Sequence, residues 1–266
     1  MVEIIAGLLA LLAGLGGTGG YWANQTARQL LLDQLDQAEV LEVRVESIPN
    51  TQILAGQADR VLIAARGLHR QPFPRVDVFE LETDPIFVDL GSLTLNQPLQ
   101  AAARIAIRVD DLNQALQDPE ILAQFEDIEA DLPFASRSEG EGSLFDLREP
   151  EVAFLPEQQV RLSAVLVEKT LAGEDLDQLE IEFISGIAVE SGQTLRLVDP
   201  EFIVGSVPVP REIAGAFLGG LTEVLDLRVL AEQGITLRVL QLELNPEQLQ
   251  VIAFVRIDRL PESLPD

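Results

Sequence analysis

The sequence predicts an α+β fold with extensive antiparallel sheet, and three observations lead to that prediction. Apolar and polar residues alternate over many short segments, as they do in strands with one buried face. Hydrophobic residues make up 47% of the 266 positions, which is ample for a large core. Helical spacing is confined to a few segments that separate groups of strands along the chain.

The first element is a charge-free stretch from Ile4 to Ala23. As a helix with a rise of ~1.5 Å per residue, it would span ~30 Å, about the hydrocarbon core of a bilayer. A single membrane anchor, a cleaved signal and a helix of the folded domain all fit this stretch. Glu3 disfavours the signal, because a positive residue is expected there. We therefore predict an anchor or signal-like segment over 1–24 and an α+β domain over 25–266.

The side of the membrane stays open between periplasm and cytoplasm. Arg28, the nearest flanking positive charge, weakly favours a cytoplasmic domain. The segment Gln25 to Glu39 has apolar residues at helical spacing and predicts a helix that continues from the N-terminal stretch.

A first group of strands is predicted from period-two alternation. These strands are expected at Leu41–Val45, Val61–Ala65, Val76–Thr83 and Gln100–Val109. In the last of them, the side chains expected on the buried face are Ala101, Ala103, Ile105, Ile107 and Val109.

A helical block is predicted over Asp110–Ile128, divided in two by Pro119. The polar, glycine-containing segment 136–143, SRSEGEGS, then predicts a flexible loop or the boundary between two halves of the domain.

The second half of the chain repeats the order of strands followed by a helix. Its strands are predicted at Glu151–Leu155, Val160–Leu171, Leu179–Val189, Thr194–Val198, Glu201–Val204, Ile235–Leu244 and Leu249–Ile257. The helix is predicted over Arg211–Glu232, after Pro208 and Pro210 and before Gly234. Its broad apolar stripe includes Phe217, Leu221 and Val224.

Charge and residue types exclude several classes of function. The chain has 44 acidic and 18 basic residues and a net charge of −26, which disfavours nucleic-acid binding. With no cysteine and one histidine, disulfides, thiolate sites and histidine-rich metal sites are excluded. No recognised catalytic motif occurs, so we predict a protein that is not an enzyme and needs no cofactor or metal.

Four segments carry a resemblance to a known family. They are VRVESIPNTQILAGQADRVLIAARGL, FELETDPIFVDLGSL, QPLQAAARIAIRVDDLNQAL and LVDPEFIVGSVPVPREIAGAF, in this order. Together they resemble the LmeA-like phospholipid-binding family, a bacterial family common in cyanobacteria and actinobacteria, over roughly Val40 to Ile257.

The resemblance implies a fold like that of the bactericidal permeability-increasing and tubular lipid-binding proteins. There a highly twisted antiparallel sheet wraps a long helix and leaves an elongated apolar cavity for acyl chains. Family members have no catalytic residues to transfer onto this sequence.

From residues and resemblance together, we predict a bacterial, membrane-associated protein that holds the acyl chain of a phospholipid or glycolipid in an apolar groove. Lipid transfer or assembly of envelope glycolipids would be its role. The residues expected to line the groove are Ile105, Ile107, Leu162, Leu166, Phe217, Leu221 and Val224. The alternative is a membrane-anchored acidic scaffold with a filled core and no ligand.

Overall fold

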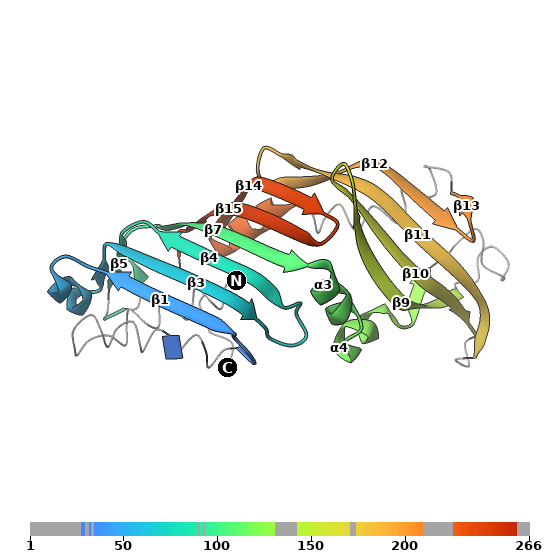
Figure 1. Ribbon diagram of the computed structural model, residues 1–266, viewed down its shortest axis with the longest axis horizontal. Coiled ribbons are helices and arrows are strands. Elements are labelled where there is room, and N and C mark those ends of the chain that lie inside the picture. Colours follow the sequence, from blue (N-terminus) through green and yellow to red (C-terminus); the bar gives the residue numbers. More distant parts are fainter. Residues whose placement is uncertain are drawn as a thin grey trace.

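Two antiparallel sheets of six strands each lie at opposite ends of an elongated molecule (Figure 1). The computed structural model describes residues 28–29, 32, 35–89, 91–92, 94–130, 143–170, 174–209 and 226–259. A third, three-stranded sheet packs beside the first of the two large sheets. The predicted abundance of antiparallel strands is therefore confirmed.

The first large sheet combines strands from both ends of the chain, in the order β1-β3-β4-β7-β15-β14. The strands are β1 (Val40–Glu46), β3 (Arg60–Leu68), β4 (Val76–Thr83), β7 (Leu99–Arg108), β14 (Ile235–Asn245) and β15 (Gln248–Ile257). All five pairings are antiparallel, and β15 pairs with β7 over ten positions from Gln248–Arg108 to Ile257–Leu99. The C-terminal hairpin thus returns to the N-terminal sheet rather than extending the second.

One face of this sheet is apolar and buried, as the alternation predicts. Its buried side chains include Leu41, Val43, Val61, Ile63, Leu81, Ala103, Val255 and Ile257. They are covered by the 3-10 helix η1 (Asn50–Ala55), by β2 (Gln57–Ala58), β5 (Ile86–Asp89) and β6 (Thr94–Leu95), and by Leu230. We call this cluster the first core.

Short helices connect the two large sheets. The block predicted over Asp110–Ile128 forms α3 (Val109–Leu116), α4 (Pro119–Leu122) and the 3-10 helix η2 (Ala123–Phe125). The predicted division at Pro119 is confirmed, and the Asp118 carboxylate caps α4 by accepting from the Glu120 amide at 2.9 Å.

The second large sheet is a meander in the order β13-β12-β11-β10-β9-β8. Its strands are β8 (Ile128–Ala130), β9 (Ser143–Leu155), β10 (Gln159–Lys169), β11 (Asp175–Glu190), β12 (Thr194–Val204) and β13 (Val207–Pro208). Strands β9, β10 and β11 bend along their length (Figure 1). The two strands predicted at Thr194–Val198 and Glu201–Val204 are one strand, β12, with an irregular register around Asp199.

A second cluster of buried apolar residues joins the two large sheets. Val152, Phe154 and Val160 of the second sheet meet Leu244 of β14. Three residues of α3, namely Val109, Leu112 and Leu116, pack against them together with Leu249 of β15. We call this group the junction cluster.

Hydrogen bonds reinforce the junction. Asn113 on α3 donates to the Val152 carbonyl at 2.9 Å and accepts from the Val152 amide at 2.7 Å, so it pairs with β9 as another strand would. The Gln158 side chain accepts from the Leu244 amide at 2.7 Å. The two sheets are therefore fixed to each other by polar and apolar contacts.

The predicted α+β class, with a sheet wrapped around a long helix, is wrong. The protein is mostly strand, and the longest helix in the described part of the chain, α3, has eight residues. A wrapped helix is not needed to bury the first sheet, because the small sheet, η1 and Leu230 already cover its apolar face. Of the helix predicted over 211–232, residues 211–225 lie outside the described range, and Leu227–Gln233 form a 3-10 helix, η3.

The predicted helix over Gln25–Glu39 extends too far. The amides of Asp36 and Gln37 donate to the His69 carbonyl at 3.0 and 3.1 Å, and this bridge to the end of β3 replaces the last helical turn.

Two other predicted segments lie largely outside the described residues. They are the stretch 1–24 and the loop 136–143, of which only Ser143 is described. Within the described ranges, no helix has the length and hydropathy needed to cross a membrane.

Candidate functional site

One face of the second sheet is almost entirely apolar. The strand register places Leu162 beside Val152 and Phe183, and Phe183 beside Phe202. Residues that face each other in an antiparallel pair lie on the same face, and so do residues two apart in a strand. The apolar side chains of this face are Phe145, Leu147, Val152, Phe154, Val160, Leu162, Ala164, Leu166, Leu179, Ile181, Phe183, Phe202 and Val204, and the register also places the buried polar residues Ser185 and Glu168 on it. We call it the apolar face.

The apolar face is only partly covered. At its end near α3, Val152, Phe154 and Val160 are buried in the junction cluster. Farther along, Phe145, Leu166, Phe183 and Val204 are also buried, whereas Leu162 is 36% exposed and three further side chains are half-buried, namely Leu179, Ile181 and Phe202. Leaving such side chains in water is unfavourable, so this part of the face has capacity for an apolar partner.

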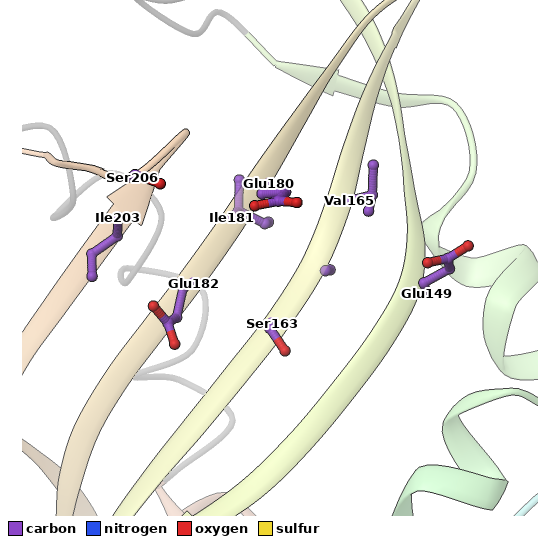
Figure 2. Close-up of a pocket in the computed structure, with 9 residues that line it drawn as sticks. Glu149, Ser163, Val165, Glu180, Ile181, Glu182, Ile203 and Ser206 are labelled. Carbon is purple, nitrogen blue, oxygen red and sulfur yellow. The ribbon is translucent and has the colours of Figure 1, made fainter.

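The opposite face of the same strands carries carboxylates beside apolar side chains. A cavity of about 320 Å³ lies there, lined by Glu149, Ser163, Glu180, Glu182 and Ser206 and also by the apolar Ala164, Val165, Ile181 and Ile203. Figure 2 shows Glu180, Glu182 and Ser163 on the neighbouring strands β10 and β11. In the described part of the chain, no three acidic or histidine side chains are grouped so that they could hold a metal ion.

An ion-pair cluster fixes one end of the polar face. Asp146 is buried, and its carboxylate accepts from the Asp127 amide at 3.0 Å, from Lys169 Nζ at 3.1 Å and from Arg148 at 3.2 Å. Burial alone would raise the pKa of Asp146, but these hydrogen bonds outweigh it and lower the pKa below its usual value. Arg148 also pairs with Asp175 at 2.8 Å. The cluster joins β9, β10 and β11 and has a structural role.

Most of the strand arginines are paired with carboxylates. Arg104 contacts Glu80 at 3.2 Å on the neighbouring strand, and Arg161 contacts Glu182 at 3.5 Å. These pairs are largely exposed, so each contributes little to stability. Arg196 is exposed and has no hydrogen-bond or ion-pair partner in the described part of the chain.

The residues predicted to line a groove fall in two places. Leu162 and Leu166 both lie on the apolar face of β10, where Leu166 is buried and Leu162 is exposed. Ile105 and Ile107 lie on the apolar face of β7 in the first sheet and are half-buried. The remaining three predicted residues, Phe217, Leu221 and Val224, lie outside the described range.

The junction cluster connects these two places. Ile107 pairs with Leu249, which packs against the cluster, while Ile105 packs against the first core. Leu162 pairs with Val152, which belongs to the cluster. The predicted residues of β7 and β10 are thus linked through packed side chains, although they do not line one common cavity in the described structure.

Sequence reasoning missed several residues of the apolar face. Phe183 lies opposite the predicted Leu162, Ile181 lies opposite Ala164, and Phe202 lies opposite Phe183. None of these three residues was predicted to line the groove. The signal was present, since Leu179, Ile181 and Phe183 alternate with Glu180 and Glu182. Alternation identifies a buried face of each strand, but the register is needed to show that the faces form one surface.

Comparison with known proteins gives a family assignment for the chain. No curated protein and no solved structure gives a significant match to the chain. A model of the LmeA-like phospholipid-binding family, in contrast, matches residues 14–254, which is most of the chain and includes both large sheets. The match confirms the resemblance found in the sequence, and the chain therefore belongs to the LmeA-like phospholipid-binding family.

Proposed function

We propose that the protein holds an acyl chain of a phospholipid or glycolipid against the apolar face of the second sheet. The observation that carries the proposal is the contrast between the two faces of one sheet, of which one is mostly aliphatic and aromatic, whereas the other carries carboxylates such as Glu180 and Glu182 beside apolar residues. Family membership supplies the class of ligand, and the partly exposed apolar face supplies a surface for it.

The size of the face suits this ligand. From Val160 to Leu166 the apolar face runs ~20 Å along β10, at ~3.4 Å per residue. Half of the ~30 Å hydrocarbon core of a bilayer, the depth of one leaflet, is ~15 Å. Each methylene moved from water to such a surface contributes ~0.8 kcal/mol, so burial of one chain outweighs the cost of immobilising it.

The role that follows from this geometry is that of a membrane-associated carrier or holder of lipid. The acidic face disfavours direct adsorption to anionic headgroups and leaves the acyl chain as the recognised part. Transfer of lipid between membranes and supply of a glycolipid for envelope assembly both use this property. Identification of the headgroup of the bound lipid would show whether that lipid is a phospholipid or a glycolipid.

The test compares two glutamate substitutions on neighbouring residues of β10. Leu162→Glu places a charge on the apolar face, whereas Ser163→Glu places it on the polar face of the same strand. Native mass spectrometry with organic extraction measures the lipid that co-purifies with each full-length protein, and circular dichroism checks that each variant folds.

The wild-type protein and Ser163→Glu are expected to retain lipid in stoichiometric amount, and Leu162→Glu is expected to lose at least about 90% of it, because a carboxylate on the face must be desolvated. If a folded Leu162→Glu protein keeps its lipid, or if the wild-type protein carries and takes up none, the proposal is wrong.

A further inference from the structure

A cavity of about 550 Å³ lies on the outer face of the first sheet, opposite the first core. It is formed by β7, β15 and β14, which lie side by side (Figure 1). The residues that line it are Gln100, Thr236, Arg238, Leu240, Phe254, Arg256 and Asp258. Cavities that hold small molecules have volumes of about 300–1,000 Å³, so this one has the size of a ligand site.

The strand register brings the two arginines of the cavity together. Arg256 on β15 lies opposite Thr236 on β14 and opposite Gln100 on β7. Arg238 lies two residues beyond Thr236, opposite Phe254. The two arginines are therefore diagonal neighbours on one face, where long side chains are within reach of each other. Their guanidinium groups can contact one ligand between them.

No carboxylate neutralises Arg238, although the chain has 44 acidic residues and only 18 basic ones. Among the arginines of the described ranges, only Arg196 and Arg238 have no hydrogen-bond or ion-pair partner, and both are exposed. All five N–H groups of the Arg238 guanidinium are thus available to an acceptor from outside the chain.

Arg256 keeps part of its donor capacity. Its Nε and Nη2 atoms contact a single oxygen of Asp258, at 2.9 and 2.8 Å, and its Nη1 atom has no partner in the part of the chain that is described. Two guanidinium groups and one carboxylate leave the cavity with one excess positive charge. In a chain with a net charge of −26, such a site attracts an anion locally.

The carboxylates next to the cavity leave this positive charge in place. On the same face of the neighbouring strand β4, Glu80 and Glu82 pair with arginines of β7 and β3, at 3.2 and 2.9 Å. Glu190 belongs to the β11–β12 hairpin, whose Gly192 approaches Arg238, but Glu190 forms no ion pair with Arg238. The unpaired guanidinium is therefore not a partner of any described acidic residue.

We propose that this cavity binds the phosphate group of a phosphate ester. The lining side chains that carry hydrogen-bond donors are Gln100, Thr236, Arg238 and Arg256. Because they come from three strands, they suit the tetrahedral oxygens of phosphate better than the two coplanar oxygens of a carboxylate. Leu240, which is 64% exposed, and the half-buried Phe254 offer contacts to the carbon part of the ester.

The proposal goes beyond the proposed function, because the cavity lies on the first sheet and the apolar face on the second. A phospholipid headgroup and a soluble phosphate ester share the chemistry that the cavity recognises. The experiment therefore uses one ligand of each kind.

The test compares the two unpaired arginines. Arg238→Gln removes a positive charge from the cavity, and Arg196→Gln removes the same charge from β12, outside the cavity. Isothermal titration calorimetry of the full-length proteins measures binding of glycerol 3-phosphate, of dihexanoyl phosphatidylglycerol below its micelle concentration, and of acetate. Circular dichroism checks that each variant folds.

Wild type and Arg196→Gln are expected to bind the phosphate esters with affinities equal within about twofold. Arg238→Gln is expected to lose at least about tenfold in affinity, because its charge-assisted hydrogen bonds to phosphate are removed. Acetate is expected to bind wild type at least about tenfold more weakly than the esters. The proposal is overturned if wild type binds neither ester, if both variants lose affinity equally, or if acetate binds as well as the esters.

The two esters distinguish the sources of the phosphate. Dihexanoyl phosphatidylglycerol that binds at least about tenfold more tightly than glycerol 3-phosphate, with this advantage lost in Leu240→Ser, assigns the cavity to a lipid headgroup. Equal affinities assign it to a soluble ester.

Leu162→Glu separates this proposal from the proposed function. Binding of dihexanoyl phosphatidylglycerol that is lost in Leu162→Glu but kept in Arg238→Gln overturns the phosphate cavity and supports the apolar face. Binding that is lost in Arg238→Gln but kept in Leu162→Glu supports the phosphate cavity, whatever lipid co-purifies with the protein.

Discussion

Asn113 illustrates how a single side chain can connect two sheets. Its amide makes both hydrogen bonds that a neighbouring strand would make with Val152, at 2.9 and 2.7 Å. Asparagine suits this position because its side chain carries a donor and an acceptor on one carbon, as a peptide group does. The residue thereby orients α3 so that Leu112 and Leu116 enter the junction cluster.

Removal of this side chain is expected to loosen the junction. Asn113→Ala leaves the Val152 amide and carbonyl without these partners and should reduce the free energy of unfolding by about 1–3 kcal/mol. Urea denaturation measures the change. Gln114→Ala is the matched control, since Gln114 is exposed on the same helix and should change stability by less than about 0.5 kcal/mol. Equal effects of the two substitutions would show that Asn113 has no special role.

The ionised carboxylate of Asp146 stabilises the second sheet through its hydrogen bonds and ion pairs. Its folded-state pKa is lowered, whereas the unfolded carboxyl has a pKa of about 3.9. The stabilisation is therefore fully present above about pH 4 and is lost as the pH falls through the folded-state pKa. Asp146→Asn should cost about 2 kcal/mol at pH 7 and progressively less below about pH 4.

The control for Asp146 is a surface ion pair. Asp258→Asn removes the partner of Arg256, at 2.8 Å, where both side chains are 46% exposed, so it should cost less than about 1 kcal/mol. Thermal unfolding of both variants between pH 3 and pH 7 compares them. A constant difference between wild type and Asp146→Asn across this range would contradict the assigned role of the carboxylate.

Among the elements of the fold, a tight turn allows a hairpin of the second sheet to contact strand β14 of the first sheet. The hairpin between β11 and β12 turns at Gly192, which has a φ of +75°, and the Gly192 carbonyl accepts from the Val239 amide of β14 at 2.7 Å. A Cβ at this position would lie 3.2 Å from the Val239 carbonyl oxygen. Glycine is therefore required both for the backbone conformation and for the close approach to β14.

Two glycine substitutions separate these requirements. Gly205→Ala, at a φ of +54° with open space around the new Cβ, should cost only the conformational strain of about 1 kcal/mol. Gly192→Ala has the same strain and must also displace β14, so we expect about 1–2 kcal/mol more. Chemical denaturation of both proteins tests this difference, and equal losses would show that the contact with β14 carries no cost.

At the scale of the whole molecule, the two large sheets differ in how well they are covered. The apolar face of the first sheet is buried by elements of the described structure, whereas much of the apolar face of the second is half-exposed. Bound lipid is therefore expected to stabilise the second sheet more than the first. This difference follows from the proposed function and makes it testable without any mutation.

Delipidation is expected to affect the sheets unequally. Lipid at about 100 times its Kd would stabilise the folded state by ~2.7 kcal/mol, and this is lost in the lipid-free protein. Hydrogen exchange followed by mass spectrometry should then show faster exchange in β10, β11 and β12 but little change in β3, β4 and β7. Equal acceleration in both sheets, or none, would contradict lipid contact at the apolar face.

The sequence by itself determined most of the strands of this protein. Val76–Thr83 was predicted with the observed bounds, and the alternation of Ala101 and Ala103 with Gln100 and Arg104 gave the correct buried face of β7. These features depend on the local spacing of apolar and polar side chains, which can be seen in the amino-acid sequence. Family membership was also available, because it follows from the order of segments such as that from Val43 to Leu68.

Only the tertiary structure decided how these strands are arranged. The return of β14 and β15 to β7, the cover of the first core by a small sheet in place of a long helix, and the union of Leu162, Phe183 and Phe202 on one face all depend on pairing between distant residues. Strand pairing is made by backbone groups that are the same in every residue, so alternation reveals which face of a strand is buried but not which strand lies beside it.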